Sequence, residues 1–144
     1  MKKILTVLFS IVCIVTNIDA QTITANSIAQ NSVKQGEEFV VTVNISKCDL
    51  SCFAQYCQQL PEGFTAQEIN GGSDNANFYF EKNKVLFQWY KLPINRENVV
   101  LKFSVKVQDT LKTGKYQIPG YFTYQINNKL GYVETLSDIE ITTK

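Results

Sequence analysis

A strict two-residue alternation of apolar and polar side chains is the feature of this sequence that most limits its fold. It is clearest over residues 39–45 and 99–107, where every second position holds Phe, Val, Leu or Ile. This period is typical of a β-strand with one buried face. Residues 78–81 and 85–90 form a hairpin pattern across Lys82-Asn83-Lys84, in which Asn83 best tolerates a left-handed backbone.

Further strands are expected at 116–126 and 136–143, with a weaker first strand around Ile23 and Ile28. Pro119 and Gly120 interrupt the ladder, so a bulge or a sheet edge is expected there. The only candidate for a short helical turn is 47–58. The pattern predicts an all-β fold: an antiparallel β-sandwich of seven to nine strands, immunoglobulin-like or jelly-roll, with a small barrel as the rival.

The first twenty residues have the pattern of a cleaved signal peptide. Lys2 and Lys3 precede an apolar run over 4–15, and Ala20 offers a small residue for cleavage. The run is shorter than the roughly 20 residues that span a bilayer, so a membrane-spanning protein is not expected. The sequence therefore predicts a signal peptide at 1–20, a single domain at 21–144, and export to the periplasm or the cell exterior, including the cell surface.

Charge and composition exclude several functions. With 14 basic and 13 acidic residues, no field of one sign attracts nucleic acid. The absence of histidine removes Ser-His-Asp and Cys-His catalysis and His-ligated metals. No cofactor and no metal are expected.

Three cysteines lie within ten residues, at Cys48, Cys52 and Cys57. Cys48 and Cys52 flank a tight bend and are predicted to form a disulfide in an oxidising compartment. Cys57 is predicted to be a buried free thiol that points inward with Phe53. A three-thiolate metal site would need a fourth ligand, and the spacing is not that of a zinc knuckle.

Two tyrosines, Tyr90 and Tyr121, fall on the outer register of their strands and are candidate ligand-binding residues. The loop 71–77 is rich in oxygen ligands, but its single carboxylate, Asp74, makes an ordinary loop the better interpretation. The remaining acidic residues are scattered. A small hydrolase that uses a pair of carboxylates is therefore less favoured than a protein-binding or a carbohydrate-binding module.

The run Ser32-Val33-Lys34-Gln35-Gly36-Glu37-Glu38-Phe39, leading into an alternating strand, resembles the opening of cohesin-like and related immunoglobulin-like domains of the bacterial envelope. Leu60-Pro61-Glu62-Gly63-Phe64 resembles the segment that follows there. The leader ending in Ala-Gln resembles those of exported Bacteroidota proteins. The resemblance implies a non-catalytic module that binds an envelope or extracellular protein. A carbohydrate-binding module that uses exposed aromatic residues is the alternative.

Overall fold

The structure is a computed structural model, and it describes residues 22–144; the predicted signal peptide lies outside the described residues. Within them the chain is all-β, with ten strands and no helix. The expected seven to nine strands were too few, because a three-residue strand is too short to show alternation. The strands are β1 (Thr24–Ile28), β2 (Ser32–Lys34), β3 (Glu38–Ser46), β4 (Ala54–Gln59), β5 (Phe64–Glu68), β6 (Asn77–Glu81), β7 (Lys84–Trp89), β8 (Asn98–Val107), β9 (Gly114–Ile126) and β10 (Lys129–Thr142).

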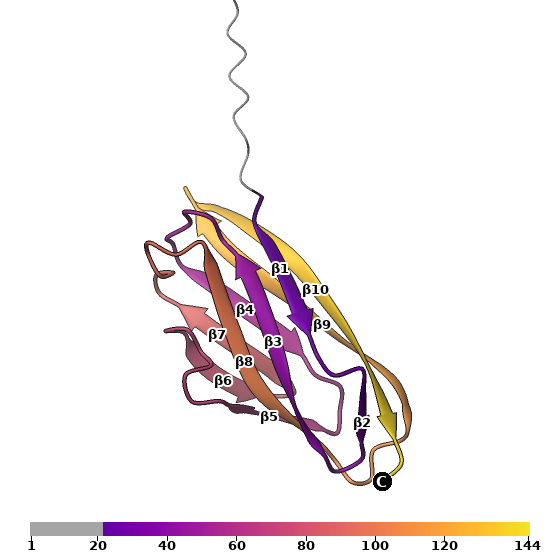
Figure 1. Cartoon of the computed structure of the whole chain (residues 1–144). Coiled ribbons are helices and arrows are strands. Elements are labelled where there is room, and N and C mark those ends of the chain that lie inside the picture. Colours follow the sequence, from indigo (N-terminus) through magenta and orange to yellow (C-terminus); the bar gives the residue numbers. More distant parts are fainter. Residues whose placement is uncertain (1–21) are drawn as a thin grey trace, which may run out of the picture.

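The strands form two sheets that pack face to face (Figure 1). One has four strands in the order β1-β3-β8-β5, and the other has six in the order β2-β10-β9-β4-β7-β6. All pairings are antiparallel except that of β2 with β10. Two separate sheets confirm the predicted β-sandwich and exclude the small barrel.

The alternation in the sequence sets which side chains are buried. On β3, Phe39, Val41, Val43 and Ile45 are at most 2% exposed, while the residues between them are exposed or half-buried. β8 repeats this with five buried apolar residues, and its residues 98–106 pair with the whole of β3. These residues meet Phe87, Trp89 and Phe122 of the opposite sheet in one core.

The turns of two hairpins each consist of two residues with positive φ. Lys82 (φ 52°) and Asn83 (φ 62°) join β6 to β7, and Asn127 (φ 49°) and Asn128 (φ 61°) join β9 to β10. Two successive left-handed residues define a type I′ turn, whose twist matches that of the flanking strands. The left-handed conformation predicted for Asn83 is confirmed.

The interruption at Pro119 and Gly120 is a sheet edge and not a bulge. β9 pairs with β10 in unbroken register from Gly114 to Ile126, but its pairing with β4 stops at Gly120. Gly120 faces the core, where a Cβ atom would lie 2.6 Å from the Tyr56 hydroxyl and 2.7 Å from Thr135 Oγ1. Glycine is needed here because the Tyr56 hydroxyl occupies the space of a side chain.

That hydroxyl belongs to a buried polar network that joins the two sheets. Tyr56 donates to Gln58 Oε1 (3.1 Å) and lies 2.9 Å from Thr135 Oγ1. Gln58 Nε2 in turn donates to Ser27 Oγ (3.1 Å) on β1 and to the Ile118 carbonyl (3.3 Å). Burial raises the pKa of Tyr56 to about 12, against the opposing effect of its hydrogen bonds to Thr135 and Ser27.

The segment 47–58, the one candidate for a short helical turn, contains a turn and a strand but no helix. Its start is a turn closed by a hydrogen bond from the Leu50 amide to the Lys47 carbonyl (3.0 Å), and its end is β4. The Lys47 side chain is 1% exposed, and its ammonium group donates to the Leu50 carbonyl (2.9 Å) and the Cys48 carbonyl (3.4 Å). The Lys47 ammonium group thus holds the turn by binding two carbonyl groups that, in a helix, would accept hydrogen bonds from backbone amides.

Candidate binding face

The outer face of the six-stranded sheet carries two rows of side chains that run across five strands. Register fixes the rows, because directly paired residues point to the same side of a sheet. We call these two rows the amide–tyrosine face. The first row is Tyr79, Leu86, Cys57, Tyr121 and Glu134, and the second is Asn77, Gln88, Gln55, Thr123 and Tyr132.

The face combines flat rings with neutral hydrogen-bonding groups. Tyr79, Tyr121 and Tyr132 are 50%, 42% and 65% exposed. Of the ten residues only Glu134 is charged, and it lies at the β10 end of its row. Rings with amide groups between them can stack on a ligand and also exchange hydrogen bonds with it, without the cost of desolvating a charge.

The outer face of the four-stranded sheet has a different chemistry. Its strands place no aromatic side chain outward, and three of its residues on β3 and β8 are charged. The outward residues of β3 and β8 are Glu38, Val40, Thr42, Asn44, Ser46, Asn98, Val100, Lys102, Ser104 and Lys106. The exposed tyrosines of the strands therefore collect on one side of the sandwich.

The structure places Tyr121 and Tyr90 apart. Tyr121 lies within the first row, level with Cys57 and Leu86. Tyr90 is 78% exposed and comes just after the last residue of β7, four residues beyond Leu86, which is about 13 Å along a strand. By register, the tyrosine nearest to Tyr121 is Tyr132, its diagonal neighbour on β10.

Cys57 is buried, at 6% exposed, but its predicted direction was wrong. It pairs with Tyr121 and Leu86 on the amide–tyrosine face, whereas Tyr56 and Gln58 point into the core. A hydrogen bond to Cys57, the charge of that thiol and partial burial raise the pKa of Tyr121. The Tyr121 ring is 42% exposed, so its face remains available for stacking on a ligand.

Sequence reasoning missed the other two tyrosines of the face. Tyr79 could have been found, because a two-residue hairpin turn places it opposite Leu86, which has the same outward parity as Tyr90. Tyr132 lies in the first half of β10, which was not expected to be a strand. Its position follows from pairing with Thr123 across the Asn127-Asn128 turn.

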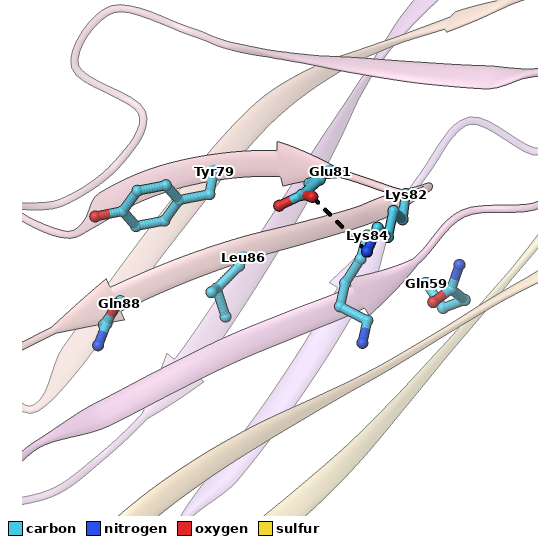
Figure 2. A pocket seen from close by; sticks show the side chains of 7 residues that line it. All are labelled: Gln59, Tyr79, Glu81, Lys82, Lys84, Leu86 and Gln88. Carbon is cyan, nitrogen blue, oxygen red and sulfur yellow. Dashed lines mark ion pairs between the residues drawn. The ribbon is translucent and has the colours of Figure 1, made fainter.

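A shallow hollow of about 540 Å³ marks one end of the amide–tyrosine face (Figure 2). Tyr79, Leu86 and Gln88 form part of its lining. The others come from the hairpin turn and the end of β4: Gln59, Glu81, Lys82 and Lys84. The hollow is open to solvent and continuous with the two rows, so a ligand on the face could extend into it.

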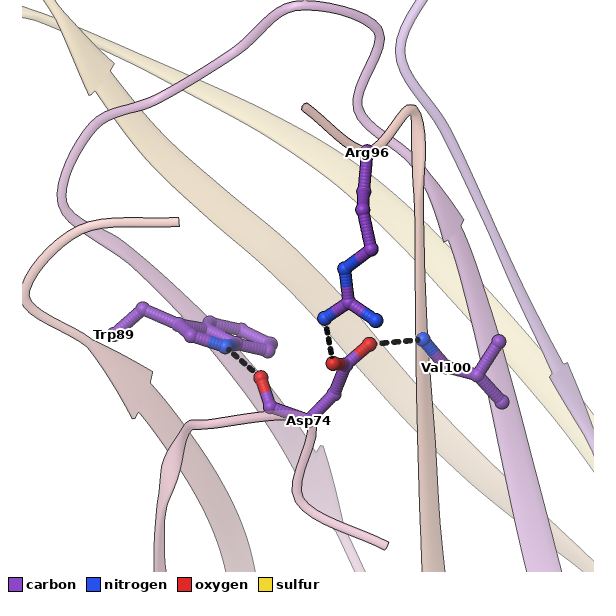
Figure 3. A network of polar contacts seen from close by, with 4 residues as sticks. All are labelled: Asp74, Trp89, Arg96 and Val100. Atoms are coloured by element: carbon purple, nitrogen blue, oxygen red, sulfur yellow. Dashed lines mark hydrogen bonds and ion pairs between the residues drawn. The ribbon is translucent and has the colours of Figure 1, made fainter. Parts of the chain in front are cut away.

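The oxygen-rich loop 71–77 is tied to the protein through Asp74 (Figure 3). One carboxylate oxygen binds Arg96, and the other accepts a hydrogen bond from the Val100 amide (3.1 Å). The Asp74 carbonyl accepts a hydrogen bond from Trp89 Nε1 (3.0 Å). These contacts occupy the one carboxylate of the loop, which favours a structural role.

The cysteines at 48, 52 and 57 are free thiols in this structure, so the Cys48–Cys52 disulfide stays a prediction. Burial raises the pKa of Cys52, although a backbone hydrogen bond from Gln125 and the charge of Lys47 oppose it. Over residues 22–144 no three Cys, Asp or Glu side chains gather as metal ligands. The same residues include no helix of a length and hydrophobicity that would cross a membrane.

Comparison with known proteins shows the fold. No protein-family model and no curated protein sequence matches the chain. A non-cellulosomal cohesin from the archaeon Archaeoglobus fulgidus has a similar structure, with a TM-score of 0.54 and 15% sequence identity over 83% of this chain and 91% of that one. A CARDB domain from Pyrococcus furiosus has a TM-score of 0.48 and 11% identity, over 85% of this chain and 94% of that one. In fold, the chain is a β-sandwich similar to that of the cohesin.

Proposed function

We propose that the protein is an exported, non-catalytic binding module that recognises a protein partner through the amide–tyrosine face. The observation that carries this proposal is that the exposed tyrosines within the strands all lie on one outer face of the sandwich. A monomeric domain has no need to gather Tyr79, Tyr121 and Tyr132 on one sheet, because the rings gain little from solvent there. Tyrosine is also among the residues most enriched at the centres of protein interfaces.

The shape of the face fits a protein partner. It is part of a broad, continuous sheet, and its hollow is shallow and lies at one end. Enclosed clefts are typical of small-molecule sites, whereas flat surfaces are typical of protein–protein contact. The cohesin-like fold agrees with a module of this kind, and the signal peptide predicted from the sequence of residues 1–20 supports export.

Carbohydrate is the second candidate ligand, and the amide row favours it. Gln55 and Gln88 are paired neighbours on β4 and β7, beside Tyr79 and Tyr121 of the adjacent row. Planar amides can both donate to and accept from sugar hydroxyls, and an aromatic ring can cover the C–H face of a sugar.

Charge-introducing variants test which face binds. Thr123→Arg places a long charged side chain in the middle of the amide–tyrosine face, and Asn44→Arg does the same on the outer face of the four-stranded sheet. Each purified protein is assayed for capture of protein from an extract of its native source and for binding to a glycan array. We expect Thr123→Arg to abolish binding and Asn44→Arg to leave it unchanged; the reverse pattern contradicts the proposal.

Tyr121→Ala separates the two ligand classes. Truncation of a central interface tyrosine costs more than about 1 kcal/mol, or about fivefold in Kd. If glycan binding is present in the wild type and lost in Tyr121→Ala, the ligand is carbohydrate. If a protein is captured and no glycan binds, the ligand is protein.

A further inference from the structure

We propose that β6 is a dimerisation edge, where two copies of this chain pair their β6 strands antiparallel about Tyr79. The two six-stranded sheets then join into one continuous sheet. This inference does not depend on what the amide–tyrosine face binds, since it concerns the backbone edge of the sheet.

β6 differs from the other three edge strands of the sandwich, which are β1, β2 and β5. It alone has aromatic residues at its three central positions, Phe78, Tyr79 and Phe80. Edge strands are usually protected by lysine, proline or a bulge, and β6 has none of these within its length. An unprotected aromatic edge is a surface that pairs readily with another strand.

The free hydrogen-bonding groups of β6 are arranged symmetrically about Tyr79. In a hairpin with a two-residue turn, the pair next to the turn, Glu81 with Lys84, is hydrogen-bonded, and bonded pairs alternate from there. The N–H and C=O groups of Phe78 and Phe80 therefore point away from β7. Among residues 22–144, neither has a backbone hydrogen bond outside the β6–β7 ladder.

Self-pairing satisfies all four of these groups. With Tyr79 opposite Tyr79 of the second copy, Phe78 faces Phe80 of the second copy in a hydrogen-bonded pair, and the same pair forms again by symmetry. A second copy thus supplies an edge whose free groups match in this register. An unrelated strand would match them only by chance.

The side chains also fit this pairing. Phe78 and Phe80 point toward the core but are only half-buried, with Phe78 packed at 5.2 Å on Phe87. Phe80 and Phe78 of the second copy would cover their exposed edges. On the other side of the sheet, Tyr79, seen on β6 in Figure 2, would lie beside its own copy. Tyrosine pairs across strands are favourable.

Charge does not oppose the pairing. In this register Glu81 of one copy lies opposite Asn77 of the other, so no like charges meet. The interface is short compared with the roughly 800 Å² per partner of a stable complex, so the dimer is weak and depends on concentration.

Sedimentation velocity of the wild type from about 10 μM to about 1 mM measures the association. Tyr79→Lys and Tyr79→Glu each place two like charges side by side on the two-fold axis, and each should weaken the dimer by at least about tenfold. An equimolar mixture of the two variants restores it, because lysine then meets glutamate. Tyr90→Lys, which changes an exposed tyrosine outside β6, is the matched control and dimerises as the wild type does.

Amide hydrogen exchange locates the interface. The Phe78 and Phe80 amides should exchange more slowly as concentration rises, whereas the Tyr79 amide, already in the β6–β7 ladder, should change little. A wild type that stays monomeric at the highest concentration overturns the proposal. So does a dimer that survives Tyr79→Lys unchanged, or one that leaves the Phe78 and Phe80 amides unprotected.

Discussion

Removal of the Tyr56 hydroxyl tests whether the buried polar network holds the two sheets together. In Tyr56→Phe, Gln58 Oε1 loses the donor at 3.1 Å and Thr135 Oγ1 loses its partner at 2.9 Å. Leaving a buried polar atom without a partner costs about 1–3 kcal/mol, so for these two atoms we expect a loss of about 2–6 kcal/mol in the free energy of unfolding. Urea denaturation measures it as a lower midpoint at an unchanged m-value.

The control is Tyr90→Phe, which removes a hydroxyl from a 78% exposed ring. This variant should differ from the wild type by less than about 0.5 kcal/mol. If Tyr56→Phe is as mild as the control, the network contributes nothing and the reasoning is refuted.

The same residue gives a pH dependence. The pKa of Tyr56 is about 12 in the folded protein and about 10 in an unfolded chain. The folded state holds the proton more tightly, so this stabilisation is complete below pH 10 and is lost as the pH rises toward 12. By pH 11 the gap between wild type and Tyr56→Phe should narrow by about 1.4 kcal/mol. A gap that stays constant from pH 8 to pH 11 contradicts the assignment.

Three further predictions concern single positions. Gly120→Ala pushes a methyl group against the Tyr56 hydroxyl and should cost about 1–3 kcal/mol in urea denaturation; a neutral effect would show that the site can relax. Calcium should leave the Tm unchanged, because Arg96 and the Val100 amide already occupy the Asp74 carboxylate, and a rise in Tm with calcium concentration would be evidence against this role. Lys82→Asn should raise the unfolding free energy by up to about 1 kcal/mol, since asparagine adopts the left-handed backbone more easily than lysine; a loss of stability would contradict the turn assignment.

The sequence was sufficient to predict the long strands that have one solvent-exposed face and one buried face. On β3 and β8 all nine positions that face the core hold Phe, Val, Leu or Ile, so alternation alone gives the register. The β6–β7 hairpin was also accessible because its pairing is local, although its turn is only Lys82 and Asn83, and Lys84, expected in the turn, belongs to β7.

β4 could not be assigned in this way. It lies between β9 and β7 and points Tyr56 and Gln58 inward, while the smaller, less polar Cys57 points outward. The inward direction of Gln58 depends on Ser27, and that of Tyr56 on the space left by Gly120. Both partners are distant in the sequence, so hydrophobic parity pointed the wrong way.

The binding face depends on non-local pairing as well. Tyr79 and Tyr121 belong to one row only because β7 and β4 lie between them in the sheet. The outward register of Tyr121 was visible in the sequence, but its neighbours were set by strand order.

Site-directed photo-crosslinking tests the central claim most directly. A benzophenone amino acid replaces Thr123 on the amide–tyrosine face, or Asn44 on the outer face of the four-stranded sheet, in cells that make the protein. The account predicts a discrete covalent adduct from position 123 and none from position 44. Adducts from position 44 alone, equal adducts from both, or none from either would contradict it.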